Sequence, residues 1–378
     1  MSEQISYAKT VYGQKEIDAV VRCLNESTQM GNYARKFERE ISLLFDKKYC
    51  LYVNSGSSAL YIGIEAFQFP EGSEIITPAL TFSTTVGCII KNKLIPVFCD
   101  VTPLTYCIDT SKIEDLISEK TKAIIAPNLM GNICEWDKIR EIADRHNLIV
   151  IEDSADTLGA TIGSKPTGNY SDISITSFYG SHIISCAGNG GMFLTNDKKM
   201  YERAKVLRSW GRMSTLYKDS ENIKNRLNIK LQGYDYDKKF VFSEIGYNFE
   251  PSEVGASFGL VQLKKFNNFN RIRNYNFNLH LDFFNKFQEY FITPKIDKNV
   301  KTNFLAYPVI LKKNKFFNRK KLQIYLENNN IQTRTIFTGN ILKQPVMKNK
   351  KFKYHKNCNT IADDVMKNGI LIGCHQGM

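Results

Sequence analysis

Three stretches of the chain carry groups that are suited to chemistry. His182 brings an imidazole, which in its neutral form is a competent base near neutral pH. Asp153 is the second of two acidic residues that directly follow the apolar, strand-like run 148–151. An aspartate at such a place often only caps the next helix. Asn54-Ser55-Gly56-Ser57-Ser58 opens a predicted helix, whose free backbone N–H groups can cradle a phosphate. The three stretches offer a base, a carboxylate and an anion-binding turn.

The order of these stretches resembles that of a known enzyme family. Ser177-Phe178-Tyr179-Gly180-Ser181-His182, followed by Gly188-Asn189-Gly190-Gly191, is similar to the S-F-x-x-x-K…G-E-G-G stretch of sugar aminotransferases. These form the DegT/DnrJ/EryC1/StrS family of enzymes, which depend on pyridoxal phosphate (PLP). The resemblance extends from Gly31 through Phe37-Glu38 to Pro345. It implies an α/β protein of PLP-dependent fold type I, similar to aspartate aminotransferase, with a mixed, mostly parallel sheet in its large domain.

The resemblance implies a set of cofactor-binding residues. Asp153 is expected to pair with the pyridine nitrogen, because an ionised aspartate keeps the ring protonated and able to accept electrons. Gly56 and Ser57, joined by Ser177, are expected to bind the phosphate, and Phe82 to stack on the ring. Simpler interpretations exist, since a Gly-Ser turn is a common helix cap and most phenylalanines belong to the core.

Gly246-Tyr247-Asn248 is similar to the G-Y-N motif of the family, whose asparagine reaches the cofactor phosphate of the neighbouring subunit. The resemblance therefore implies a homodimer with shared active sites. Relatives usually carry Arg or Lys two places after the asparagine, whereas this chain has Glu250, which leaves the contacts there open.

The histidine stands where the family carries a lysine that binds PLP covalently and moves protons. An imidazole can move protons, but it cannot form the Schiff base that tethers PLP. We therefore expect PLP, or its amine form PMP, to bind noncovalently at the site that contains His182. Within the family this exchange marks the sugar 3-dehydratases, which make 3,6-dideoxy sugars from nucleotide-linked 4-keto-6-deoxy hexoses. Asp156, assigned to the cofactor site, and the run 333–340 with Gln344-Pro345 resemble the same subgroup.

The cysteines separate two kinds of 3-dehydratase. The nine cysteines include no C-x-C or C-x-x-C pair, and a [2Fe–2S] cluster needs four closely placed thiolates. We therefore expect no iron-sulfur cluster and no metal site. The resemblance then points to the type that takes its reducing equivalents from L-glutamate and acts on a GDP-linked sugar for surface polysaccharide. The sequence does not decide the nucleotide, or between a hexose and a heptose.

Four further residues are candidates for the sugar-nucleotide site. The guanidinium of Arg334 can bind a carboxylate or a diphosphate in bidentate fashion, although a surface arginine is the simpler interpretation. Tyr247, Asn340 and His375 are expected to line the sugar pocket.

Two alternative functions are compatible with the same residues. In the first, the protein is an ordinary sugar aminotransferase that uses another lysine, and Lys165 is the nearest candidate, although Gly163-Ser164-Lys165-Pro166 reads as a turn outside the site. In the second, the protein is a catalytically inactive binding protein with a PLP-type fold. That function would leave Asp153, Ser177 and Gly56 with no reason to keep cofactor chemistry.

The bulk properties favour a cytoplasmic globular enzyme. The chain has 378 residues, and we find neither a leader-like start nor an apolar run of the roughly 18 residues that a membrane span needs. The net charge of +13 suits an anionic partner, but the lysines are dispersed except between Lys312 and Lys353, so we expect neither a nucleic acid nor a membrane as partner.

Short apolar runs alternate with helical patterns through the first two-thirds of the chain, which indicates an α/β arrangement. Helices are predicted over 111–119, 136–146 and 245–263. The polar stretch 201–236 precedes the last of these. We therefore expect a large domain over residues 1–250 and a smaller α/β domain over 251–378.

Overall fold

A computed structural model describes residues 4–217, 220–354 and 360–378. Its centre is an eight-stranded sheet with the strand order β1-β9-β8-β5-β4-β2-β3-β16. The strands are β1 (Tyr49–Val53), β2 (Glu74–Pro78), β3 (Ile95–Cys99), β4 (Thr121–Pro127), β5 (Ile149–Ser154), β8 (Ile173–Ser177), β9 (Gly191–Thr195) and β16 (Lys353–Tyr354). Most of their residues are buried apolar side chains, as expected for strands that are covered on both faces.

Seven of these strands run in the same direction. β9 is antiparallel to both of its neighbours, β1 and β8, and all other pairs are parallel. The carboxyl ends of β1, β2, β5 and β8 therefore meet at one edge of the sheet. In α/β sheets ligands bind outside this edge, so the segments that follow these strands are placed to form a site.

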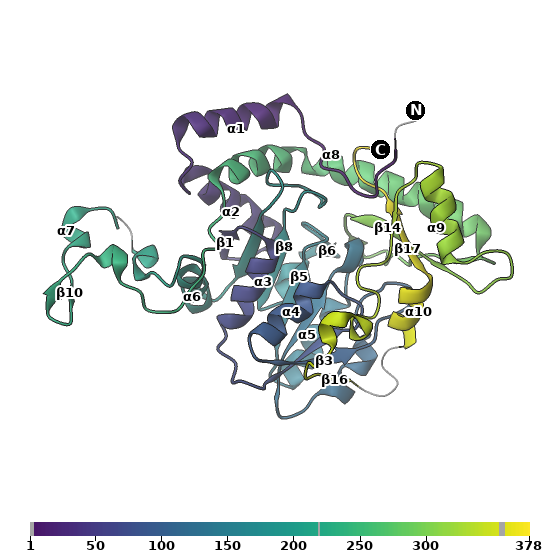
Figure 1. Cartoon of the computed structure of the whole chain (residues 1–378), viewed down its shortest axis with the longest axis horizontal. Helices are drawn as coiled ribbons and strands as arrows, with labels where there is room; N and C mark the ends of the chain where they lie inside the picture. The colour runs from purple at the N-terminus through teal and green to yellow at the C-terminus, as the bar shows by residue number, and fades with distance from the viewer. Residues whose placement is uncertain (1–3, 218–219, 355–359) are drawn as a thin grey trace.

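Helices cover the sheet and connect it to the C-terminal part of the chain (Figure 1). They are α1 (Gln14–Glu26), α2 (Asn32–Phe45), α3 (Gly56–Glu65), α4 (Ser83–Lys91), α5 (Trp136–Arg145), α6 (Lys198–Arg208), α7 (Ile223–Arg226), α8 (Glu253–Phe284), α9 (Arg319–Asn328) and α10 (Thr360–Asn368). The 32-residue α8 spans much of the molecule, with α1 and α2 packed against its first half.

The C-terminal part forms a smaller antiparallel sheet of four strands in the order β12-β14-β17-β15. Its strands are β12 (Phe291–Ile292), β14 (Ala306–Leu311), β15 (Thr333–Arg334) and β17 (Gly369–Gly373). Two small sheets complete the fold: β6 (Thr161–Ile162), β7 (Lys165–Pro166) and β13 (Val300–Lys301) in one, and β10 (Lys230–Leu231) with β11 (Tyr234–Asp235) in the other. The segment with α7 and β10 extends away from the body of the molecule (Figure 1).

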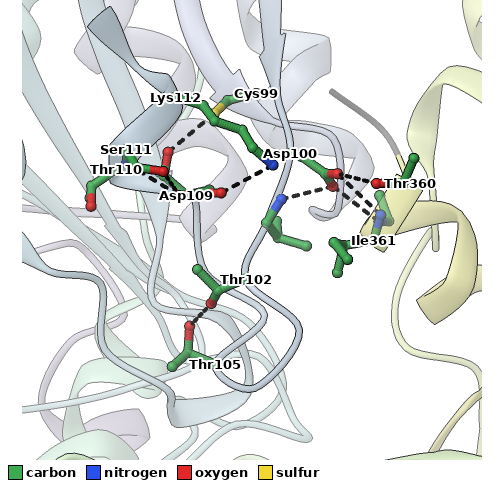
Figure 2. Close-up of polar contacts among 12 residues, drawn as sticks. Cys99, Asp100, Thr102, Thr105, Asp109, Thr110, Ser111, Lys112, Thr360 and Ile361 are labelled. Atoms are coloured by element: carbon green, nitrogen blue, oxygen red, sulfur yellow. Dashed lines mark hydrogen bonds and ion pairs between the residues drawn. The ribbon is translucent and has the colours of Figure 1, made fainter. Parts of the chain in front are cut away.

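Asp100, directly after β3, ties the large sheet to α10 (Figure 2). Its buried carboxylate accepts hydrogen bonds from the N–H groups of Ile361 and Ala362, both at 3.1 Å. These N–H groups lie in the first turn of α10, where no intrahelical acceptor exists for them. A carboxylate at this place caps the helix and favours its dipole, so a residue of the large sheet fixes the start of a helix near the end of the chain.

The expected α/β alternation is confirmed, with corrections to single elements. The predicted helix over 111–119 is wrong, because the structure has two 3₁₀ turns, Thr110–Lys112 and Glu114–Leu116. Ile113 and Leu116, three residues apart, pack into the core, and this spacing suits a 3₁₀ turn. The helix predicted from residue 245 begins at Glu253 after the Ser252 cap and continues to Phe284.

The division near residue 250 stays a prediction. Segments on either side of it exchange contacts, since β16 joins the large sheet and Ile5 forms a bridge with Ile331. None of the described helices is long and apolar enough to cross a membrane.

Candidate active site

A cavity of about 360 Å³ lies at the carboxyl edge of the large sheet. Seven residues that the sequence assigns to cofactor binding or catalysis line it together: Gly56, Ser57, Phe82, Asp153, Asp156, Ser177 and His182. They come from segments after β1 and β2, from the ends of β5 and β8, and from the loop that follows β8. The sheet topology thus brings residues 126 positions apart in the sequence to one place.

The anion-binding end of the cavity is built from two helix starts. Gly56 is the first residue of α3, and Ser57 donates a hydrogen bond of 3.2 Å to Thr84, at the start of α4. Ser177, at the end of β8, lies so close that a Cβ atom on Gly56 would stand 2.7 Å from its Cβ. Two positive helix ends, two hydroxyl groups and a glycine that allows close approach suit a phosphate group.

Asp153 supplies a buried carboxylate beside this cradle. It accepts hydrogen bonds from Thr85 Oγ1 at 3.0 Å and from the N–H of Ala155 at 3.2 Å. No lysine or arginine of the described chain forms an ion pair with Asp153. Burial raises the pKa of Asp153 to about 6. A carboxylate in this state gains from a cationic partner, and a protonated pyridine ring is such a partner.

Asp156 is a second buried carboxyl group in the cavity. Its Oδ2 accepts the N–H of Met130 at 2.9 Å, and burial raises the pKa of Asp156 to about 7, with a smaller contribution from the charge of Asp153. The two acids therefore carry less than two full negative charges between them near neutral pH. One of them is available as a hydrogen-bond donor to a ligand.

His182 holds a neutral imidazole at the opposite wall. Its Nδ1 lies 3.3 Å from the carbonyl oxygen of Ser177, and a carbonyl can only accept, so Nδ1 carries the proton. This leaves Nε2 as the free base. Burial, with a smaller contribution from the charge of Arg273, lowers the pKa of His182 to about 4, although the hydrogen bond to Ser177 opposes this shift.

Arg273 of α8 holds the loop that carries His182. The buried guanidinium donates to the carbonyl oxygen of His182 at 3.3 Å and to those of Phe304 and Leu305 at 2.8 and 3.1 Å. Its Nε donates to the side chain of Gln376 at 2.6 Å. One arginine therefore joins the loop of His182 to the C-terminal part of the chain, and no local motif in the sequence signalled it.

The N-terminal segment contacts both the loop after β8 and the residues before β15, and it contributes to the cavity wall. The backbone of Ile5 pairs with Ile331, the N–H of Tyr7 donates to the side chain of Gln332 at 3.0 Å, and the Thr10 hydroxyl donates to the carbonyl oxygen of Gly180. The side chain of Tyr7 thereby becomes part of the cavity wall. Residues 5–10 form what we call the N-terminal strap, and its role was missed because contacts between distant segments leave no local pattern.

Arg334 lies next to the cavity because it contacts Tyr7, the residue of this strap that lines the cavity wall. Its guanidinium is exposed and lies 5.0 Å from the ring of Tyr7, within range of a cation–π contact. Phe337 from the same segment lines the cavity and meets Phe82 edge to face, with ring centroids 6.2 Å apart. Phe82 is 54% exposed, so the aromatic wall faces open space and is not core, contrary to the simpler interpretation of that residue.

The remaining predicted residues do not line this cavity. Tyr247 donates to Glu65 at 2.7 Å and stacks on Phe249. Asn340 is buried and donates to Asp363 at 2.7 Å, and His375 is buried against Ser6. Their side chains make contacts within the fold around the site. Their expected part in a sugar pocket stays a prediction.

Asn248 is exposed and also stands apart from the cavity. Its backbone forms a bridge with Ser209, and its carbonyl oxygen accepts from Asn54 at 3.5 Å. Within the described residues, no group of three or more His, Cys, Asp or Glu side chains is arranged to hold a metal ion.

Fold and site together define a class of protein, the PLP-dependent aminotransferase fold, here with a buried aspartate and two helix starts at the carboxyl edge of its sheet. The model of the DegT/DnrJ/EryC1/StrS aminotransferase family matches residues 11–378, and the chain belongs to this family.

Three curated relatives show its similarities within the family. The lipopolysaccharide biosynthesis protein RfbH of Salmonella typhimurium is 32% identical over 97% of this chain and 86% of its own length. The GDP-4-keto-6-deoxy-D-mannose 3-dehydratase of Escherichia coli O55:H7 is 31% identical over 98% of this chain and 95% of its own. The GDP-perosamine synthase of Caulobacter vibrioides is 32% identical over 69% of this chain and 65% of its own.

Two solved structures of 3-dehydratases are similar to nearly the whole of this chain. The E. coli GDP-4-keto-6-deoxy-D-mannose 3-dehydratase with bound hydrated PLP superposes with a TM-score of 0.89, with 29% identity, over 100% of this chain and 96% of that one. A structure of GDP-4-keto-6-deoxymannose 3-dehydratase with a trapped PLP-glutamate geminal diamine gives a TM-score of 0.87, with 29% identity, over 98% and 96% of the two chains.

Proposed function

We propose that this protein is a PLP/PMP- and L-glutamate-dependent 3-dehydratase that acts on a nucleotide-linked 4-keto-6-deoxy sugar, with GDP as the expected nucleotide. One observation carries the proposal. The cavity has a neutral histidine at the catalytic position, and no lysine is among the described residues that line it. Lys165, the alternative lysine, is exposed at β7, outside the cavity. Similarity to relatives named 3-dehydratases supports the same reaction.

The described residues fit the cofactor. PLP and PMP, when bound, supply an electron sink for the carbon that loses a proton. Asp153, which has a raised pKa and lacks a cationic partner, would hold the protonated pyridine nitrogen. Gly56, Ser57 and Ser177 would hold the phosphate, Phe82 would lie against the ring, and Asp156 would donate or accept a hydrogen bond. With no lysine in the wall, binding would be noncovalent.

His182 would carry the proton transfers of both halves of the reaction. In the first half, its Nε2 would take a proton from the α-carbon of glutamate and pass it to C4′ of the cofactor, so that glutamate leaves as 2-oxoglutarate and its amino group remains. In the second half, Nε2 would take a C4′ proton. The imidazolium would then protonate the hydroxyl group on C3 of the sugar, which leaves as water. The exposed Arg334, which contacts Tyr7 of the cavity wall, would bind the diphosphate or a glutamate carboxylate.

The test is the mass of the sugar nucleotide after incubation of the protein with PLP, L-glutamate and GDP-4-keto-6-deoxymannose. The proposal expects the loss of one oxygen atom, together with formation of 2-oxoglutarate and ammonia. Unchanged substrate, both with this sugar and with other nucleotides and heptose analogues, while the protein retains PLP, would mean a binding protein that lacks this activity.

An aminotransferase is the second candidate, because a GDP-perosamine synthase is also similar to this chain. It would replace the ketone of the sugar with an amine and leave the hydroxyl group on C3 in place. Treatment with sodium borohydride distinguishes the two, because reduction fixes PLP to the protein only if a lysine forms a Schiff base with it. The 3-dehydratase is expected to release its cofactor after this treatment.

We further propose that the protein works as a cytoplasmic homodimer with shared active sites, within deoxysugar synthesis for surface polysaccharide. Asn248 supports the dimer, since it is exposed and lies outside the cavity of its own chain, where a partner's phosphate site could reach it. Light scattering on the purified protein measures the mass in solution, and a monomer at micromolar concentration would contradict shared sites.

A further inference from the structure

The second half of α8 carries apolar side chains on two faces. Phe277 and Phe284 are buried in the core of the C-terminal sheet. On the outside, Tyr275, Leu279, Phe283 and Phe287 are 63, 50, 53 and 38% exposed, and they follow one another at intervals of four residues. This spacing lines them up along one side of the helix end. Packing within the described chain does not explain an exposed apolar row of this size.

Positive charge gathers beside the row. Residues 282–327 carry ten lysines and arginines against four aspartates and glutamates, a net charge of +6. The exposed lysines that stand within four residues of an exposed phenylalanine in this region include Lys286, Lys312, Lys313 and Lys315. No ion pair engages these four among the described residues.

Contacts join the two features into one surface. The Lys312 ammonium donates to the carbonyl oxygen of Gln288 at 2.6 Å, next to Phe287. Lys315 lies 5.4 Å from the ring of Phe316, which is 62% exposed and packs near Tyr290. The end of α8 and the start of α9 lie at the same end of the molecule, far from α7 and β10 (Figure 1).

We propose that this α8 surface, formed by Leu279, Phe283, Phe287 and Phe316 with the four lysines, docks the enzyme on a lipid bilayer that carries anionic headgroups. Apolar side chains from a helix end and an adjacent loop can enter the boundary between headgroups and acyl chains. The lysine stems can extend along that boundary while their ammonium groups contact lipid phosphates. Neither the apolar side chains nor the lysines alone are sufficient, because weak interfacial binding requires both apolar burial and electrostatic attraction.

The positive charge of the α8 surface, together with its apolar row, distinguishes an anionic bilayer from other partners that could occupy it. A second copy of the chain would bring two faces of like charge together in a symmetric contact, which opposes association through this surface. Nucleic acid would neutralise the lysines, but its phosphates would leave the apolar row in water. An anionic bilayer satisfies both the charge and the apolar row. The expectation of no membrane partner rested on the lack of a spanning segment and of a continuous basic patch, whereas this surface combines separate segments of the chain.

The experiment is co-sedimentation of the PLP-loaded full-length protein with vesicles of phosphatidylcholine, alone or with about a third phosphatidylglycerol. We expect binding only to the anionic vesicles, with at least tenfold weaker binding for Phe283→Ser/Phe287→Ser and for Lys312→Gln/Lys313→Gln/Lys315→Gln. The matched control, Lys91→Gln/Lys93→Gln/Lys120→Gln, removes the same charge from exposed positions on the large domain and should bind like the wild type.

Turnover without vesicles should be the same in all these variants, because none of the changed residues lines the cavity, and this result also shows that they fold. Three results would overturn the proposal: no binding to either vesicle, equal binding by the control and the two surface variants, or a molecular mass that falls when Phe283 and Phe287 are replaced. The last would assign the surface to a second copy of the chain. Binding to duplex DNA in place of vesicles would assign it to nucleic acid.

Discussion

At the scale of single residues, the site depends on the shifted protonation equilibria of buried groups. His182 is kept neutral, while Asp153 and Asp156 are kept partly protonated, and burial is the largest cause in each case. The arrangement suits a cofactor whose protonated ring nitrogen would pair with Asp153 and whose reaction would require His182 to move protons. Two predictions belong to this scale.

The first concerns His182→Asn. The side chain keeps a polar group of similar size but cannot accept a proton from carbon, so PLP binding should stay within a few-fold of wild type. Both half-reactions should slow by at least about 100-fold. Conversion of PLP to PMP by glutamate, followed by absorbance, isolates the first half. Turnover near that of the wild type would remove His182 from the proposed role.

The second concerns Asp153 and pH. Its folded pKa of about 6 lies above the value of 3.8 for the free side chain, so the folded state binds the proton more tightly. Stability of the cofactor-free protein should therefore fall as pH rises from about 4 to about 7, by about 2 kcal/mol from this residue. Urea unfolding of wild type and Asp153→Asn at both pH values measures the difference. An unchanged difference would contradict the shift. Added PLP should stabilise the wild type more than the variant at pH 7.

At the scale of elements, helix starts do much of the positioning. α3 and α4 begin at the cavity, and α10 begins on the carboxylate of Asp100, directly after β3 of the large sheet. Each start is set by one or two residues that a substitution can change without touching His182.

Gly56→Ala tests the start of α3. The added Cβ would stand 2.7 Å from that of Ser177, so the helix start or the end of β8 must move. We expect at least tenfold weaker PLP binding, measured by titration of the cofactor-free protein. Gly87→Ala is the control, since its Cβ meets nothing within 4 Å inside α4, and it should stabilise the protein by about 0.5–1 kcal/mol. Equal PLP affinity in both variants would argue against the cradle.

Asp100→Ala tests the start of α10. Two first-turn N–H groups lose their acceptor, and stability should fall by about 1–2 kcal/mol, measured by urea unfolding. Asp100→Asn, which keeps one acceptor oxygen, should lose less. Asn318→Ala is the comparison, because it removes an exposed cap from α9 that lies next to that helix in the sequence and joins no distant segments. A smaller loss for Asp100→Ala than for Asn318→Ala would contradict the role of Asp100 in joining the two parts.

At the scale of the whole molecule, the dimer proposal predicts complementation. Asn248→Ala should lose activity because a partner's cofactor loses a phosphate contact, and His182→Asn should be inactive. Equal amounts of the two, mixed under conditions that exchange subunits, should recover about a quarter of wild-type activity, because half of the dimers are mixed and each has one intact site. No recovery, although exchange is shown by mass, would place both residues in one site.

The sequence predicted this molecule best where the chemistry is local. Gly56, Ser57, Asp153, Ser177 and His182 lie within short motifs at the ends of strands, and all five line the cavity. Residues outside such motifs could not be found this way: Tyr7, Arg273 and Phe337 act through contacts with segments far along the chain. Tyr247, Asn340 and His375 lie in conspicuous stretches, yet the structure uses their side chains for packing and internal hydrogen bonds.

The N-terminal strap has a consequence for synthesis in the cell. The ribosome makes residues 5–10 long before their partners at Gly180 and Ile331, the second of which emerges when most of these 378 residues have been made. Until then Tyr7 has no place to dock, and the cavity wall stays unfinished. A nascent chain can therefore form the starts of α3 and α4 well before it can complete the cavity, so the strap is among the last segments to take its place.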